Sequence, residues 1–218
     1  MKLATFEQGG TERIGIVAGD GVIDLSRAAP ALPKDMIALI EAWPRVESEV
    51  RRVAGSASHL KLSDVHLRAP VPRPRKILAI GLNYDDHIAE SGQQKPEHQT
   101  WFAKLPNAVN GPYDPIVLPK VSASVDYEAE LVFVVARRCR HVAREQARDF
   151  VFGYCAGNDV SVRDWQFQTS QWLLGKSFDS HAPFGPWLVT PDEIDDPHTL
   201  GIRCLVNGER RKVPTPNI

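Results

Sequence analysis

The chain has 218 residues, of which 43% are hydrophobic and 24% are charged, and its formal net charge is −1. This length is enough for one well-packed core, or for a small domain beside a larger one. A charge so close to zero gives no attraction for nucleic acid or for an anionic membrane surface, so we expect neither partner.

The cysteine content and the hydropathy pattern indicate a soluble protein of a reducing compartment. Three cysteines are too few and too scattered for a disulfide framework, and their odd number suits the cytoplasm. No apolar run approaches the roughly 20 residues that span a bilayer, and the first residues lack the apolar core of a signal peptide. We therefore predict a cytoplasmic location.

The first 52 residues predict a small antiparallel unit followed by a helix. Short apolar runs at 3–6, 13–17 and 22–25 are separated by glycine-containing turns, as in paired short strands. Apolar residues then recur at helical spacing over 35–52. Pro44 lies inside this helix, and we expect it to break or kink the helix because proline removes a backbone donor.

A proline-rich segment follows the helix. Three prolines stand at alternate positions between residues 70 and 74, which favours an extended, stiff chain. We place a domain boundary there, with a small N-terminal domain at 1–68, a linker at 69–75 and a larger domain at 76–218.

The second part of the chain alternates between predicted strands and short helices. Asn207-Gly208 predicts a type I′ turn, because both residues accept positive φ angles. The remaining elements are read from apolar runs and turn residues: a buried strand at 76–81, a helix at 83–90, a loop at 91–100, strands at 115–119 and 126–136, a helix at 143–150, a core segment at 152–162 and a hairpin at 202–213.

Acidic residues alternate at the start of the long predicted strand. Glu128 and Glu130 would point the same way, just before the apolar run 131–135. Adjacent carboxylates in such a place repel each other and lose hydration, and a divalent cation is the simplest compensation. With Asp159, which follows a run of small and apolar residues, they would suit Mg²⁺, Mn²⁺ or Ca²⁺ rather than zinc. Surface or salt-bridged acids are the alternative, and spacing alone does not bring Asp159 to the pair.

Two further patterns suggest catalytic groups. His87 and Glu90 stand three residues apart on a predicted helix, so they share a face, and a carboxylate beside an imidazole makes a general base. An exposed polar face explains the same spacing, and on spacing alone it is the better explanation. Lys176 lies in an apolar stretch, where a lysine needs an anionic partner unless its ammonium reaches water.

Polar residues just after Asp159 also allow two interpretations. Arg163 and Gln166 either orient Asp159 from behind or lie on an ordinary polar surface. Their spacing from Asp159 does not decide between these interpretations.

Several short motifs, taken in order, resemble a known family. They match the fumarylacetoacetate hydrolase family in order and spacing from about residue 76 to 213, and the opening segment is similar to the small N-terminal domain of its bacterial members. The motifs are GLNYDDHIAE at 81–90, FAK at 102–104, DYEAE at 126–130, GNDVSVRD at 157–164, GKSFD at 175–179, GP at 185–186 and VNGE at 206–209.

The resemblance implies an α+β fold, in which a mixed β-sheet roll follows a small N-terminal α/β domain, and it implies a homodimer. By matching position it implies that the carboxylates Glu128, Glu130 and Asp159 bind Mg²⁺ or Mn²⁺. It implies that His87 and Glu90 activate water while Lys176 binds the substrate. The supporting or substrate-binding residues would be Tyr84, Lys104, Arg163 and Gln166.

The resemblance also implies a reaction class. Family substrates are small 2-oxo acids, and the expected activity is hydrolysis of a C–C bond in an acylpyruvate such as fumarylpyruvate or acetylpyruvate, through a pyruvate enolate whose charge the metal holds. Decarboxylation, hydration or isomerisation on the same scaffold is one alternative. Family members continue beyond the last hairpin, so we expect the C-terminal part of the roll to be missing here, and a non-catalytic truncated member is a second alternative.

Overall fold

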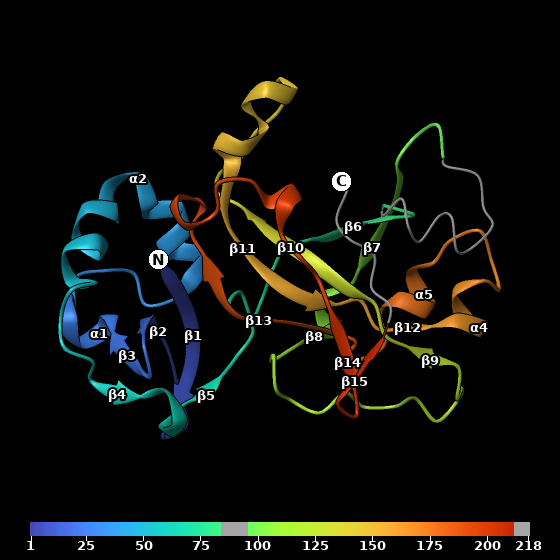
Figure 1. The fold of residues 1–218 in the computed structure, drawn as a ribbon, viewed down its shortest axis with the longest axis horizontal. Helices are drawn as coiled ribbons and strands as arrows, with labels where there is room; N and C mark the ends of the chain where they lie inside the picture. The colour runs from blue at the N-terminus through green and yellow to red at the C-terminus, as the bar shows by residue number, and fades with distance from the viewer. Residues whose placement is uncertain (84–95, 212–218) are drawn as a thin grey trace.

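The computed structural model describes residues 1–83 and 96–211 (Figure 1). Within these ranges, most strands join one nine-stranded sheet in the order β10-β11-β13-β1-β2-β3-β4, to which β5 adds beside β1 and β8 beside β13. The strands of this sheet are β1 (Lys2–Gln8), β2 (Thr11–Ala18), β3 (Gly21–Asp24), β4 (Leu60–Lys61), β5 (His66–Leu67), β8 (Val109–Asn110), β10 (Ala129–Val135), β11 (Val151–Asn158) and β13 (Ala182–Val189).

The N-terminal strands form as predicted, and a helix packs against them. Strands β1, β2 and β3 pair as successive antiparallel hairpins, and α2 (Met36–Val53) covers them beside the short α1 (Leu25–Ala28) (Figure 1). Of the two effects expected of Pro44, the break is wrong, because α2 runs through this residue without interruption. Pro44 is exposed, while buried residues on both sides of it, Leu39 and Val50 among them, hold the two halves of α2 in one core.

Strand β1 joins the N-terminal region to the rest of the chain. Lys2 and Leu3 pair with Val189 and Leu188 of β13, so strands from both sides of the proline-rich segment share one sheet. Segment 69–75 itself lies against the core, with Val71 buried. The division into domains at 1–68 and 76–218 stays a prediction.

In the part of the chain that the structure describes, three two-stranded units lie outside the large sheet. β6 (Ile77–Gly81) pairs with β7 (Thr100–Lys104), and β9 (Val125–Asp126) pairs with β12 (Ser161–Val162). β14 (Cys204–Val206) and β15 (Glu209–Arg211) form the predicted hairpin, whose turn residues Asn207 and Gly208 have φ angles of 53° and 80°. The short helices α4 (Arg163–Gln166) and α5 (Leu173–Lys176) follow β12.

Four predicted elements differ from the structure. Strand β6 forms, but it is not buried, since Leu78 is 60% exposed. Residues 115–119 form no strand, because the prolines at both ends cannot donate and Val117 bonds to the side chains of Ser180 and His181. The long strand predicted at 126–136 is interrupted at 127–128, and the helix predicted at 143–150 is a 3₁₀ helix, η3 (Arg144–Phe150). The predicted helix 83–90 extends beyond the described residues.

The described chain is mostly sheet with few helices, as expected of this fold class. None of the described helices combines the length and the apolarity needed to cross a bilayer.

Candidate active site

The ammonium group of Lys176 lies between two carboxylates. Its Nζ is 2.5 Å from Oε2 of Glu128 and 2.8 Å from Oδ2 of Asp159. Lys176 is only 1% exposed, so its charge does not reach water, and the carboxylates are the anionic partners that a lysine in an apolar stretch requires. The ring of Phe102 lies 4.8 Å from the same Nζ and closes another side of the group.

Pairing between β10 and β11 brings the two carboxylates together. Ala129 and Asn158 are opposite each other at the end of this ladder. The Asn158 Oδ1 accepts the backbone N–H of Glu128 at 2.9 Å, and the backbone N–H of Asp159 donates to the carbonyl of Glu128, also at 2.9 Å. These bonds fix the backbone where each strand ends, so Glu128 and Asp159 face one another although they are far apart in sequence.

Close packing of two short helices places Lys176. Gly175, just before it, lies against the backbone of Gln166 in α4, and a Cβ at Gly175 would lie 2.4 Å from that backbone nitrogen. Only glycine allows this approach of α5 to α4. The side chain of Gln166 is buried as well.

Two further cations hold the other oxygens of the same carboxylates. Lys104, which is 4% exposed, donates to Oδ1 of Asp159 at 2.6 Å and to the carbonyl of Val160 at 3.1 Å. The Nη1 of Arg163 lies 2.8 Å from Oε1 of Glu128. Arg163 therefore supports Glu128, and not Asp159 as one interpretation of the sequence suggested. Among the described residues, three cations thus contact the two carboxylates.

These charges shift the proton affinities of the site. Burial acts to raise the pKa of Asp159, but Lys104 and Lys176 outweigh it and keep that pKa below its ordinary value. Burial lowers the pKa of Lys104, although Asp159 partly opposes the shift. Burial also acts to lower the pKa of Arg163, but Glu128 and Asp126 outweigh it and raise that pKa. Asp159 is therefore a carboxylate at neutral pH.

The third predicted metal ligand takes a separate partner. The Nδ2 of Asn83 is 3.4 Å from Oε2 of Glu130. Across residues 1–83 and 96–211, no three His, Cys, Asp or Glu side chains stand together as a ready metal cluster. The donor chemistry nevertheless fits a hard dication, since Glu128 and Asp159 both offer carboxylate oxygens and each turns one of them toward the buried ammonium of Lys176. The metal-ligand roles of Glu128, Glu130 and Asp159 stay predictions.

Three predicted site residues, Tyr84, His87 and Glu90, lie outside the described residues. Conversely, the structure gives contacts in the site to Phe102 and Asn158, which the sequence did not single out, and to Lys104, which only the resemblance did. The sequence could have indicated Lys104, because a lysine that ends an apolar strand needs an anionic partner when it is buried.

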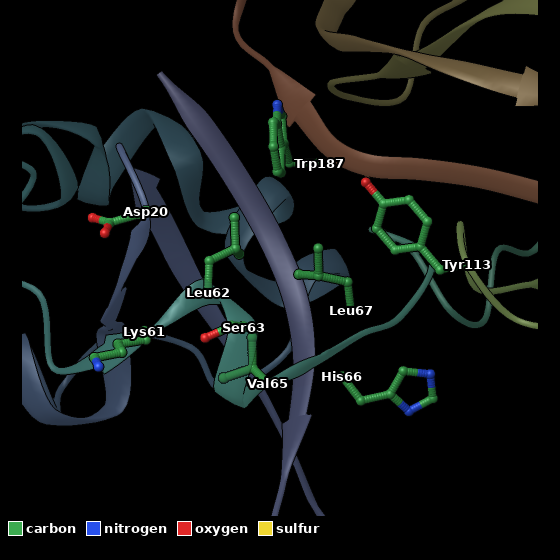
Figure 2. A pocket seen from close by; sticks show the side chains of 9 residues that line it. All are labelled: Asp20, Lys61, Leu62, Ser63, Val65, His66, Leu67, Tyr113 and Trp187. Atoms are coloured by element: carbon green, nitrogen blue, oxygen red, sulfur yellow. The ribbon is translucent and has the colours of Figure 1, made fainter.

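A pocket elsewhere on the molecule is separate from this site. Figure 2 shows Trp187 of β13 and Tyr113 facing the residues of the β4–β5 region. These residues line a pocket of about 530 Å³. Its lining residues include none of the acids or cations described above. His66 at its rim is bonded to Asp114, with 2.5 Å between Nε2 and Oδ1. The pocket therefore adds nothing to the chemistry of Lys176 and its partners.

Comparison with known proteins agrees with the resemblance seen in the sequence. Residues 76–215 match the family described as fumarylacetoacetate (FAA) hydrolase, C-terminal. A mitochondrial oxaloacetate tautomerase from Xenopus laevis is 42% identical over 216 residues, which cover 96% of this chain and 68% of the relative. Others of these relatives are matched over as little as 62% of their length.

Solved structures similar to this chain include a maleylpyruvate hydrolase. A putative HpcE protein from Mycobacterium smegmatis is 37% identical with a TM-score of 0.84, and the match covers 96% of this chain and 74% of that one. Maleylpyruvate hydrolase from Sphingobium sp. SYK-6, in complex with manganese(II) and pyruvate, is 34% identical with a TM-score of 0.82, and the match covers 99% and 77% of the two chains.

Proposed function

Because this chain belongs to the fumarylacetoacetate hydrolase family, we propose that it is an enzyme that interconverts the keto and enol forms of a small 2-oxo dicarboxylate, with oxaloacetate as the first substrate to test. One observation carries the proposal: the buried ammonium of Lys176, held by two carboxylates, offers positive charge in a water-poor site. The 42% identity to an oxaloacetate tautomerase supports the choice of substrate.

The proposed reaction removes a proton from C3, adds a proton to the 2-oxo oxygen and needs stabilisation of the charge that develops between these transfers. Moving a proton between C3 and the 2-oxo oxygen places negative charge on that oxygen in the transition state. An ammonium fixed in a site of low dielectric stabilises such charge more than water does, because it does not need to reorient. Lys176 would take this role or bind the adjacent carboxylate, and His87 with Glu90 would exchange the proton at C3.

A divalent cation belongs to this proposal. Glu128, Glu130 and Asp159 would hold Mg²⁺ or Mn²⁺, which when bound supplies a Lewis acid for the 2-oxo group. The manganese and pyruvate in the related maleylpyruvate hydrolase support both the metal and the 2-oxo acid class. Lys104, Arg163 and Gln166 would support the ligands, and Tyr84 would line the substrate site.

The proposal is tested by following the ultraviolet absorbance of enol oxaloacetate. With Mg²⁺ or Mn²⁺ present, we expect the protein to accelerate the approach to keto–enol equilibrium without releasing CO₂. Lys176→Met should abolish the acceleration, whereas the exposed Lys61→Met should leave it unchanged. Equal rates with and without the wild-type protein would refute the proposal.

A hydrolase is the second candidate, favoured by the similarity to maleylpyruvate hydrolase. In that reaction His87 would draw a proton from water, the resulting hydroxide would attack the distal carbonyl, and cleavage of the C–C bond would leave pyruvate. Incubation with fumarylpyruvate or acetylpyruvate distinguishes the candidates, since hydrolysis releases pyruvate and tautomerisation does not. A decarboxylase, hydratase or isomerase would give other products, and a non-catalytic member would bind Mn²⁺ without turning over any of these substrates.

The sequence and the relatives point to two different compartments for the protein. The sequence predicts the cytoplasm, whereas the Xenopus relative is named as mitochondrial. Fractionation of cells that produce the chain, with detection by antibody, would decide between them.

A further inference from the structure

We propose that Lys104 and Arg163 make the proposed metal site selective for small dications over Ca²⁺. Each of them binds one oxygen of a carboxylate ligand, Lys104 on Asp159 and Arg163 on Glu128, so that this oxygen cannot bind the metal. This inference rests on the proposed function, because it assumes that Glu128 and Asp159 bind the metal.

The contacts divide the four carboxylate oxygens into two pairs. The outer oxygens, Oδ1 of Asp159 and Oε1 of Glu128, are held by Lys104 at 2.6 Å and by Arg163 at 2.8 Å. The inner oxygens, Oδ2 of Asp159 and Oε2 of Glu128, both face the ammonium of Lys176. Each carboxylate therefore presents a single oxygen to the centre of the site.

The outer cations are anchored by contacts of their own. Lys104 is almost fully buried and also donates to the carbonyl of Val160, so its ammonium has no route to water. Arg163 donates through Nε and Nη2 to Oδ2 of Asp126, at 3.0 and 2.7 Å, and through Nη1 to Oε1 of Gln166 at 2.9 Å. Releasing Oδ1 of Asp159 would leave the buried ammonium of Lys104 with only the carbonyl of Val160, which is costly, whereas Arg163 is held in place by Asp126 and Gln166. Within residues 1–83 and 96–211, the ammonium of Lys176 bonds only to the two inner oxygens, and the ring of Phe102 lies 4.8 Å from its Nζ.

One-oxygen ligands favour a small ion. Mg²⁺ requires near-ideal octahedral geometry at short distances, in which each carboxylate gives one oxygen. Ca²⁺ takes six to eight oxygens at longer distances and gains from carboxylates that bind through both oxygens. With the outer oxygens occupied, Glu128 and Asp159 cannot supply the second oxygen, so Ca²⁺ loses more than Mg²⁺ or Mn²⁺.

Titration calorimetry with Mn²⁺ and Ca²⁺ tests the inference on Lys104→Met. This variant removes the donor to Asp159 Oδ1 at a nearly constant side-chain volume. We expect the Mn²⁺ affinity to fall about 10- to 100-fold, as it does when other residues that hydrogen-bond to a metal ligand are replaced. The Ca²⁺ affinity should fall less or rise, so that the Mn²⁺/Ca²⁺ affinity ratio decreases. The loss of one positive charge acts alike on both dications and cancels in the ratio.

Two further variants make the result decisive. Arg163→Gln removes the donor to Glu128 Oε1 and should lower the Mn²⁺/Ca²⁺ affinity ratio in the same way. The test needs only one of Lys104→Met and Arg163→Gln to keep the wild-type circular dichroism spectrum. Lys61→Met, an exposed change, should leave both affinities as they are. An equal fall for Mn²⁺ and Ca²⁺, or an unchanged ratio, would overturn the inference while leaving the metal site intact. Absence of Mn²⁺ binding by the wild-type protein would instead refute the metal site itself, and the inference with it.

Discussion

At the scale of single residues, Lys176 shows how charge and burial are balanced in this protein. An isolated ammonium in an apolar environment would lose its proton or unfold the site. Here two carboxylates supply the opposing charge, and Lys104 and Arg163 pair with the second oxygen of each carboxylate. Removing one member would leave an uncompensated charge among the others.

The first prediction concerns that interdependence. Lys176→Met leaves Glu128 and Asp159 facing each other without the cation between them, and we expect it to destabilise the fold by about 3 to 5 kcal/mol, as for other broken buried pairs. Urea unfolding measures the change, with Lys61→Met as the exposed control. The double variant Lys176→Met with Asp159→Asn should recover part of the loss, and a double variant less stable than the single one would contradict the pairing.

A second prediction concerns His181. Its Nε2 is 3.1 Å from the carbonyl of Val117 and donates to it, while Nδ1 is buried without a partner among the described residues. Burial lowers the pKa of His181 from 6.5. Below pH 6.5 the unfolded chain therefore binds more protons than the folded one, so stability falls as the pH drops through the folded pKa. Asn at this position keeps a donor but does not titrate.

The measurement is the free energy of unfolding as a function of pH, for the wild type and for His181→Asn. Between pH 6.5 and the lower folded pKa, the wild type should lose stability more steeply than the variant. Parallel curves would show that His181 titrates alike in both states.

At the scale of elements, the contact between α4 and α5 gives a third prediction. A Cβ on Gly175 would lie 2.4 Å from the backbone nitrogen of Gln166, so Gly175→Ala must push α5 away and carry Lys176 with it. We expect at least about a tenfold loss of kcat/KM, since small misplacements of catalytic groups are costly. Gly55→Ala is the matched control, because a Cβ there meets nothing within 4 Å. Unchanged kinetics in Gly175→Ala would mean that α5 does not position Lys176.

Local patterns predicted the hairpins of β1–β3, the helix α2 and the turn at Asn207-Gly208, because glycine turns and apolar periodicity act within a few residues. The failures arise from distant partners. Val117 belongs to no strand, because its backbone N–H and carbonyl bond to side chains more than 60 residues away in the sequence. Pro44 did not break α2 because the sheet below holds both halves of the helix.

The candidate site was likewise predictable from the sequence only in part. The alternation of Glu128 and Glu130 was visible in the sequence, and so was the need of Lys176 for an anion. The meeting of Glu128, Asp159 and Lys176 was not visible, because it depends on the register of β10 against β11 and on the packing of α5. Only the resemblance to a family supplied that set before the fold was known.

At the scale of the whole molecule, apolar side chains remain exposed on the β6–β7 pair and on β10. Leu78 and Trp101 on the β6–β7 hairpin are 60% and 56% exposed, and Phe133 and Val135 on β10 are 56% and 51% exposed. Among the described strands, β10 is also the end of the large sheet. Exposed apolar strands at a sheet edge favour association.

The fourth prediction is therefore that the protein is a dimer at micromolar concentration, as the resemblance also implies. Light scattering after size exclusion should give twice the mass of one chain for the wild type. Phe133→Glu should shift the protein toward the monomer, whereas Leu205→Glu, equally exposed but on β14, should not. A monomeric wild type would refute the prediction.

Because β11 pairs with β13 and β13 with β1, the strand that ends at Asn158 belongs to the same sheet as the first residues of the chain. The bonds of Lys176 and Lys104 to Asp159 likewise join residues 17 and 55 positions apart. Chains with such non-local contacts fold slowly, since the entropy of closing large loops is lost before the contacts form. During refolding, helical signal from α2 should therefore return early, and catalytic competence should return only in the last kinetic phase.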